Sequence, residues 1–259
     1  MIYIIDNKDS RIKYLIDELK HSYRLETIDE LATPKEKGGV IIIPIQGIDN
    51  NGYVKNTEML FKDIINEFNP RTVFVPKLNE SLTNYNCEFI EYLTEDVEII
   101  NAKYTTEGAI CLIISNTTKS LIDMKILISG FGKLGQTLAN SIKEYGTEVS
   151  IYSNSESDLI TSKIQGLNVI KSLNNIDELN FDVIVNTVPT NIYSLETLKR
   201  TSGCIYLELA SYPYGVDVSK AKNLIKTFVG GGLPGKFTPE SAGKLIARKI
   251  KGILNDRSN

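Results

Sequence analysis

The sequence of 259 residues contains no tryptophan, only one histidine and only three cysteines. The histidine, His21, falls in the last turn of a predicted helix, so we expect it at the surface. This argues against dehydrogenases that need a His–carboxylate pair. The cysteines Cys87, Cys111 and Cys204 lack metal-ligand spacing and are odd in number. They predict reduced thiols, as in a cytoplasmic protein, and no metal site.

The sequence also lacks a strong charge imbalance and a long apolar run. It has 29 Lys and Arg against 32 Asp and Glu, for a net charge of −3. This gives no electrostatic reason to expect nucleic acid or a membrane surface as a partner. No apolar run is long enough to span a bilayer. The N-terminus enters a strand without a basic segment, which argues against a signal peptide. We expect a cytoplasmic globular protein; a homo-oligomer stays open.

The most informative stretch lies between Lys125 and Tyr152. An apolar run at 126–129 predicts a buried parallel strand, and a second run at 149–152 predicts another. Between them stand a glycine-rich turn and a helical pattern that Gly146 ends. This is the strand–turn–helix–strand context in which a G-x-G-x-x-G motif indicates dinucleotide binding.

Each glycine of the turn has a separate expected task. Gly130 permits the tight turn, Gly132 lets a pyrophosphate approach the backbone, and Gly135 lets the helix pack closely on the strand. The helix N-terminus presents free N–H groups to the phosphates. The alternative is a close-packed turn without a ligand. The turn's predicted cofactor-binding residues are Gly130, Phe131, Gly132, Lys133, Leu134 and Gly135.

The end of the second strand bears on the choice of cofactor. NAD sites usually carry Asp or Glu there, which accepts a hydrogen bond from the ribose 2′-hydroxyl. This chain has Ser153, Asn154 and Ser155, while the carboxylates of Glu156 and Asp158 lie further on. Hydroxyl and amide groups can bind a 2′-phosphate, so we expect NADP rather than NAD. A solvated loop is the alternative interpretation.

The remaining pattern predicts an α/β fold with two doubly wound, Rossmann-like domains and a cleft between them. We expect a flavodoxin-like substrate domain over 1–104 and a Rossmann NAD(P)-binding domain over 105–238. A bridging helix at 106–116, capped by Thr105 or Thr106, and a C-terminal helix at 239–255, which packs back on the first domain, would span the cleft. Further helices are expected at 10–21, capped by Ser10, and at 57–68, and further strands at 2–5, 40–43, 72–75, 97–100, 183–186, 205–209 and 226–229.

Three loops rich in glycine or proline follow strands of the second domain, at 187–190, 210–215 and 230–235. In doubly wound sheets the carboxyl ends of the strands face the ligand, so three such loops favour a ligand site over simple turns. Thr187, Val188 and Pro189 are expected beside the cofactor. Arg11 and Lys236, with the N-terminus of the last helix, are candidates to hold a carboxylate, although Arg11 alone also fits a solvated helix residue.

Five longer motifs are together more specific than the glycine-rich turn. They are TTEGAI at 105–110, ISGFGKLGQTLA at 128–139, VNTVP at 185–189, LELASYPYGVD at 207–217 and GGGLPGKFTPESAGKLIA at 230–247. Through them the chain resembles the family of dipicolinate synthase A subunits of spore-forming bacteria. A thinner match follows in Asp9-Ser10-Arg11 and in IPIQGIDNNG at 43–52.

The resemblance implies an NAD(P)-dependent oxidoreductase that works with the flavoprotein-like B subunit of dipicolinate synthase. Its substrate would be a dihydrodipicolinate ring, derived from 4-hydroxy-tetrahydrodipicolinate and oxidised to the dipicolinate of spores. A hydride would leave for the nicotinamide, and a proton for a base or water. Glu107 is the first candidate base and Glu208 the second, while Glu107 also fits a helix-start residue. Arg11 and Lys236 suit the two carboxylates of this substrate.

Two departures from the family keep other functions open. Where the family tends to carry Arg and Gly, this chain has Tyr212 and Tyr214, and it is short in its first domain. A related dehydrogenase for another small carboxylate is one alternative. An NADP-binding scaffold or regulatory subunit is the other.

Overall fold

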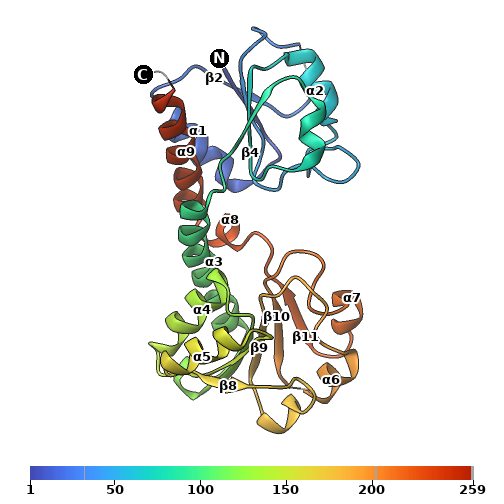
Figure 1. Ribbon diagram of the computed structural model, residues 1–259, viewed down its shortest axis with the longest axis vertical. Helices are drawn as coiled ribbons and strands as arrows, with labels where there is room; N and C mark the ends of the chain where they lie inside the picture. The colour runs from blue at the N-terminus through green and yellow to red at the C-terminus, as the bar shows by residue number, and fades with distance from the viewer. Residues whose placement is uncertain (32, 202, 258–259) are drawn as a thin grey trace. The chain divides into compact units, whose positions relative to one another are not determined.

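The computed structural model describes residues 1–31, 33–201 and 203–257. The chain divides into two compact units, the first made of Met1–Asn101 with Pro234–Asn259 and the second of Ala102–Leu233. Each unit is built on one parallel sheet flanked by helices, as Figure 1 shows, so the predicted α/β class with two doubly wound sheets is confirmed. Among the described residues, every helix is too short or too polar to cross a membrane.

The sheet of the first unit has the order β2-β1-β3-β4-β5, and all its strands are parallel. This is the strand order of flavodoxin-like folds. The strands predicted near 2–5, 40–43 and 72–75 are confirmed. The five strands are β1 Ile2–Ile5, β2 Leu25–Ile28, β3 Val40–Ile42, β4 Thr72–Val75 and β5 Glu88–Glu91.

The two strands that the sequence did not reveal are the edges of this sheet. β2 reads LETI and β5 reads EFIE, and most of their residues are only partly buried. Central parallel strands are covered on both faces and therefore read as apolar runs, whereas an edge strand can carry polar residues. A search for apolar runs consequently misses them.

Helices cover both faces of the first sheet. Because neighbouring strand residues point to opposite faces, Tyr3 and Ile5 pack with α2 while Ile2 and Ile4 pack with α1 and α9. The expected return of the C-terminal helix to the first domain is confirmed. The helices are α1 Ser10–Leu19, α2 Phe61–Phe68 and α9 Pro239–Asp256, with a 3₁₀ turn at Glu80–Asn84.

The starts of these helices differ from the predictions. Asp9, not Ser10, caps α1, because its carboxylate accepts a hydrogen bond from the Arg11 N–H. The helix expected from Thr57 begins only at Phe61, since the Thr57 hydroxyl donates to the Val54 carbonyl and holds a preceding turn. Thr238 stands at the N-cap of α9 but makes no capping hydrogen bond.

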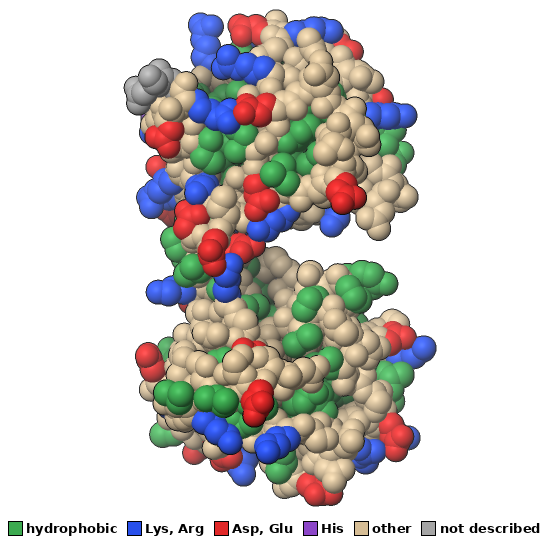
Figure 2. Space-filling view, viewed as in Figure 1, with side chains coloured by type: hydrophobic (Ala, Val, Ile, Leu, Met, Phe, Trp, Pro, Cys, Tyr) green, Lys and Arg blue, Asp and Glu red, His purple; other side chains and the backbone are tan. Residues whose placement is uncertain are grey.

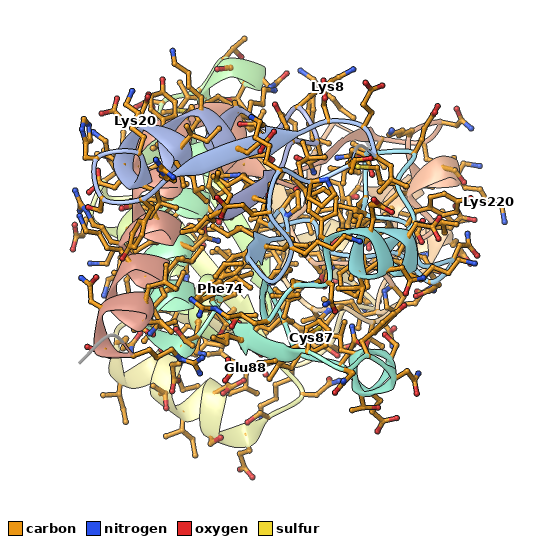
Figure 3. The ribbon with its side chains drawn as sticks, turned by 90° about the horizontal axis from the view of Figure 1, so that it is seen from above. Lys8, Lys20, Phe74, Cys87, Glu88 and Lys220 are labelled. Atoms are coloured by element: carbon orange, nitrogen blue, oxygen red, sulfur yellow. The ribbon has the colours of Figure 1, made fainter. Side chains whose placement is uncertain are left out.

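The far end of α9 is tied to the sheet edge by an ion pair. Arg257 Nη2 lies 2.7 Å from Oε1 of Glu88 on β5, and Glu88 is labelled in Figure 3. The pair is about half exposed, so it adds little to stability. What holds α9 in place is therefore its apolar face against α1 and the sheet.

Close packing of α1 on α9 depends on Gly243. A Cβ built there would strike the carbonyl oxygen of Arg11 and lie 2.9 Å from Cβ of Tyr14. We expect Gly243→Ala to force the helices apart and to destabilise the first unit by about 1–3 kcal/mol. Hydrogen exchange of α1, followed by mass spectrometry, measures this loss.

Gly252 supplies the matched control on the same helix. A Cβ there would meet nothing within 4 Å, so Gly252→Ala should stabilise the helix by about 0.5–1 kcal/mol. Equal protection of α1 in the two variants would contradict the close-packing argument.

The sheet of the second unit has the order β11-β10-β9-β6-β7-β8, again wholly parallel. Counted within the unit, this is the 3-2-1-4-5-6 order of the Rossmann fold. β8 is another edge strand that the apolar pattern missed. The strands are β6 Lys125–Ser129, β7 Glu148–Tyr152, β8 Asn168–Ile170, β9 Val183–Asn186, β10 Ile205–Glu208 and β11 Lys226–Val229.

Helices α3 Glu95–Asn116 and α8 Leu233–Phe237 contain the points where the chain passes between units. The strand expected at 97–100 is wrong, because these residues belong to α3, where Glu95, Asp96 and Glu98 suit the positive end of the helix. Thr105 and Thr106 therefore lie inside α3 and do not cap it. The other helices are α4 Lys133–Lys143, α5 Glu156–Ile164, α6 Leu195–Arg200 and α7 Val218–Ala221, with 3₁₀ turns at Leu121–Asp123 and Ile176–Leu179.

The histidine, the cysteines and the charged side chains show no special clustering among the described residues. His21 is exposed just after α1, as expected. Cys87, Cys111 and Cys204 are free thiols. On the face seen in Figure 2, acidic and basic side chains are interspersed over both units. This face therefore shows no large field of one sign.

Candidate functional site

The glycine-rich turn of the second unit lies where the strand order reverses. β6 has β9 on one side and β7 on the other, and the turn joins its carboxyl end to α4. Ligands of open α/β sheets bind at this switch point. A pocket of about 360 Å³ opens there. Its lining includes Gly130, Phe131, Gly132, Leu134, Gly135, Tyr152, Ser153, Asn154, Ser155, Thr187, Val188 and Pro189.

The three glycines of the turn are required for different reasons. Gly130 has φ +94°, and a Cβ on it would strike Oγ1 of Thr187. A Cβ on Gly135 would strike the Gly130 carbonyl oxygen. Gly132 differs, because a Cβ there would meet nothing within 4 Å. Gly130 and Gly135 thus serve the packing of the protein, whereas the space at Gly132 is open for a ligand.

The loop after β9 closes one side of the pocket. Thr187 Oγ1 donates to the Ser129 carbonyl at 2.8 Å, which ties this loop to the end of β6. The Val188 N–H donates to Oδ1 of the buried Asn186 at 3.1 Å. The structure therefore brings Thr187, Val188 and Pro189 beside the glycine-rich turn.

Polar residues after β7 form the opposite rim. Ser153 Oγ donates to Oδ2 of Asp158 at 2.7 Å, and the Ser155 hydroxyl caps α5 by accepting from the Asp158 N–H. Tyr152 donates to Oδ1 of Asn154 at 2.8 Å. Asp158 also lines the pocket. From the sequence alone Asp158 is expected beyond the cofactor site, because it follows the strand end by several residues and begins the next helix.

Glu208, the second candidate base, is fully buried at the end of β10. Its carboxylate accepts from Tyr206 Oη at 2.8 Å, Asn186 Nδ2 at 2.7 Å and the N–H groups of Ala210 and Gly215 at 3.0 and 2.8 Å. Burial raises the pKa of the carboxyl above its ordinary value, and these hydrogen bonds lower it part of the way back. The protein itself supplies these four hydrogen-bond donors. Glu208 therefore holds the end of β9, through Asn186, and the loop at 210–215, through its two N–H groups, in place.

The loop that Glu208 orders carries Tyr212 and Tyr214. Tyr212 is 82% exposed, and its ring meets that of Tyr214 edge to face with 5.8 Å between centroids. A tyrosine side chain has no cationic group, so neither residue offers the positive charge of an arginine to a carboxylate.

Glu107, the first candidate base, lies in the middle of α3 and is exposed. Its proposed placement at the positive end of a helix is wrong, because α3 begins at Glu95. The helix-start interpretation of Glu107 is therefore removed. Its exposure leaves the carboxylate accessible to solvent.

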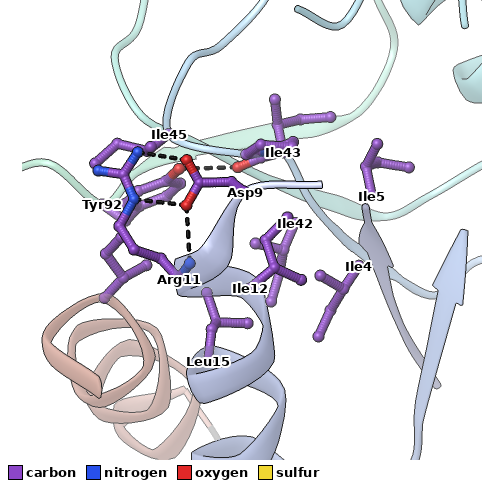
Figure 4. A pocket seen from close by; sticks show the side chains of 12 residues that line it. Ile4, Ile5, Asp9, Arg11, Ile12, Leu15, Ile42, Ile43, Ile45 and Tyr92 are labelled. Atoms are coloured by element: carbon purple, nitrogen blue, oxygen red, sulfur yellow. Dashed lines mark hydrogen bonds and ion pairs between the residues drawn. The ribbon is translucent and has the colours of Figure 1, made fainter. Parts of the chain in front are cut away.

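Arg11 lies in the first unit and is not a solvated helix residue. It is 5% exposed, and its Nη2 lies 2.6 Å from Oδ2 of Asp9. Burial raises the pKa of Asp9, but the hydrogen bonds and charge of Arg11 outweigh it and hold that pKa below its usual value. Figure 4 shows this pair among isoleucine side chains beside Tyr92.

Polar neighbours complete the Asp9–Arg11 pair. Gln46 Nε2 donates to Asp9, and Asn7 Nδ2 donates to Oε1 of Gln46 at 2.8 Å. Ser10 Oγ donates to the Gly235 carbonyl, so α8 lies at the start of α1. The polar sequence Asp6 to Ser10 indicated a turn but gave no sign of a buried network, because its partners come from distant parts of the chain.

Lys236, which the sequence predicts together with Arg11 to hold a carboxylate, follows Gly235 in α8. Its side chain is exposed, with Nζ 5.1 Å from the centroid of the Phe237 ring. Because Ser10 donates to the carbonyl of Gly235, the backbone next to Lys236 lies beside the start of α1. Glu107 belongs to the second unit.

Comparison with known proteins gives the following relatives. No family model matches the chain. The A subunit of dipicolinate synthase from Bacillus subtilis (strain 168) is 28% identical over 264 residues, which cover 93% of this chain and 87% of that protein. The crystal structure of the dipicolinate synthase A subunit from Bacillus halodurans has a TM-score of 0.81 at 22% identity, covering 98% of this chain and 97% of the other.

A more distant structural neighbour shares the fold. The D-isomer specific 2-hydroxyacid dehydrogenase of Lactobacillus delbrueckii ssp. bulgaricus, in its NAD complexed form, has a TM-score of 0.54 at 14% identity, covering 99% of this chain and 96% of the other. The fold is thus that of dehydrogenases with Rossmann units. Over almost its whole length the chain is similar to the A subunit of dipicolinate synthase, which confirms the resemblance that its motifs predict.

Proposed function

We propose that the chain is the nicotinamide-dependent subunit of an oxidoreductase that makes dipicolinate. Its substrate would be the dihydrodipicolinate ring derived from 4-hydroxy-tetrahydrodipicolinate. It would act with the B subunit of dipicolinate synthase, in the cytoplasm of a spore-forming bacterium, since the relatives are named as one part of a synthase. The observation that carries the proposal is the switch-point pocket with its open Gly132, in a chain similar throughout to the A subunit.

The pocket fits a dinucleotide. The N-terminus of α4 directs free N–H groups toward the place where a pyrophosphate would lie, and Gly132 leaves room for it. When bound, a nicotinamide dinucleotide accepts the hydride that the ring loses. Thr187, Val188 and Pro189 would pack along the bound dinucleotide, and the buried Phe131 of the turn also lines the pocket.

The roles of the chain's own polar groups follow from chemistry. Aromatisation requires the ring to lose a proton as well as a hydride, and Glu107 is the proposed acceptor because its carboxylate is accessible. Lys236 would bind one substrate carboxylate directly. Arg11 already pairs with Asp9, so we assign it to hold the start of α1, where the Ser10 hydroxyl donates to the Gly235 carbonyl beside Lys236. Arg11 would contact the substrate only while it also binds Asp9.

The test is reconstitution. Freshly generated 4-hydroxy-tetrahydrodipicolinate is supplied with NAD or NADP, with and without the B subunit of a relative. We expect dipicolinate that depends on this chain, with one cofactor reduced for each ring oxidised. Cofactor binding without any product would favour the scaffold or another substrate. Unchanged turnover in both Glu107→Gln and Lys236→Ala would remove these residue assignments.

A further inference from the structure

One carboxylate faces the part of the pocket that selects between NAD and NADP. Asp158 lines the pocket together with Ser153, the first residue after β7. The adenosine ribose of a dinucleotide lies at the end of this second strand of a Rossmann unit, where a carboxylate accepts from its 2′-hydroxyl. Asp158 reaches this strand end from the first turn of α5, since Ser153 Oγ donates to its Oδ2 at 2.7 Å.

The hydroxyl groups that the sequence assigned to a 2′-phosphate are already engaged. Ser153 gives its proton to Asp158 and accepts from the Ser155 N–H at 3.1 Å. The Ser155 hydroxyl accepts from the Asp158 N–H at 3.3 Å and shares a hydrogen bond of 2.8 Å with Ser157. A 2′-phosphate here would have to displace hydrogen bonds that cap α5.

Among the described residues that line the pocket, positively charged side chains are also missing. Of the described residues that line the pocket, none is lysine or arginine, and Asp158 is the only one with a formal charge. Lys133 begins α4 on the side of the glycine-rich turn, where the pyrophosphate common to both cofactors would lie. A 2′-phosphate would therefore meet a carboxylate at close range, which is unfavourable in a half-buried site.

We propose that the chain binds NAD(H) in preference to NADP(H), and that Asp158 determines this specificity by accepting from the ribose 2′-hydroxyl. The proposal is the opposite of the NADP preference that Ser153, Asn154 and Ser155 indicate in the sequence alone. This inference rests on the proposed dinucleotide site. It concerns binding, so it does not depend on which acid is oxidised.

The test compares the dissociation constants of NADH and NADPH for the full chain, by titration calorimetry. We expect NADH to bind at least about tenfold more tightly, the value of one well-placed hydrogen bond to a charged group. Asp158→Asn keeps the shape of the side chain and removes its charge. It should weaken the binding of NADH and strengthen the binding of NADPH, so that the ratio of NADH affinity to NADPH affinity falls several-fold. Equal or tighter binding of NADPH to the native chain would overturn the proposal.

Glu156→Gln is the matched control. Glu156 lies in the same turn of α5, is exposed and does not line the pocket. The same loss of charge at Glu156 should leave the ratio of NADH affinity to NADPH affinity unchanged. An equal fall in both variants would overturn the role of Asp158. If neither nucleotide binds, the dinucleotide site itself is contradicted, and with it this inference. If NADPH binds as tightly as NADH or more tightly, only the inference is contradicted.

Discussion

Gly132→Ala is expected to fold normally and to lose about a hundredfold in dinucleotide affinity. The residue has φ −73° and ψ −171°, a conformation that alanine adopts without strain. Its Cβ would enter open space in the free protein but would push the pyrophosphate away from the α4 N–H groups. Losing one to two hydrogen bonds to a charged group accounts for a factor of that size. Calorimetric titration with NADH measures it.

Gly135→Ala separates this effect from damage to the fold. Its Cβ would strike the Gly130 carbonyl oxygen, so this variant should lose protection from hydrogen exchange across β6 and α4 even without ligand. Gly132→Ala should keep the protection of the native chain. Normal NADH affinity in Gly132→Ala would contradict the placement of the pyrophosphate at this turn.

Asp9→Asn is expected to destabilise the first unit by about 3–5 kcal/mol, because it leaves the guanidinium of Arg11 buried without its carboxylate. Asparagine can still accept the capping hydrogen bond from the Arg11 N–H, so the change isolates the lost charge. Hydrogen exchange of α1 and β1 reports the loss. Native protection in the variant would show that Arg11 has another anionic partner.

Asp17→Asn is the control on the same helix. Asp17 pairs with Lys20 at 2.6 Å, but both side chains are exposed, and we expect no measurable change. The pH dependence follows from the lowered pKa of Asp9. The Asp9 ion pair stabilises the fold at neutral pH, and this contribution is lost as pH falls below about 4, the ordinary aspartate value, and through the lower pKa of the folded protein. Asp9→Asn should lack this acid-dependent component.

The sequence predicted the central strands and the glycine-rich turn because both leave strong local signals. β1, β3, β4, β6 and β9 are buried on both faces and read as apolar runs. The edge strands β2, β5 and β8 carry polar residues and were missed. Residues 97–100, with three apolar side chains around Glu98, predict a strand but belong to α3, where Ile99 and Ile100 are exposed. Periodicity alone cannot separate these cases in so short a run.

The candidate site was predictable where it is local and not where it depends on distant partners. The residues predicted from the glycine-rich turn line one pocket with Thr187, Val188 and Pro189, except for Lys133, which is not among the lining residues. The burial of Arg11 required Asp9, Gln46 and Gly235 together, which no sequence spacing reveals. The importance of Asp158 similarly depends on its hydrogen bond with Ser153, which turns a helix-start residue toward the end of β7.

The core of the first unit is built from both ends of the chain, because α9 returns to it. The apolar face of α9 includes Ile246 and Ile250, which share a core with Ile2 and Ile4. A ribosome that has made β1 to β5 has therefore not yet supplied one wall of that core. Residues 102–233, in contrast, form one continuous segment. All residues of the second unit are therefore synthesised before the helix that completes the core of the first unit.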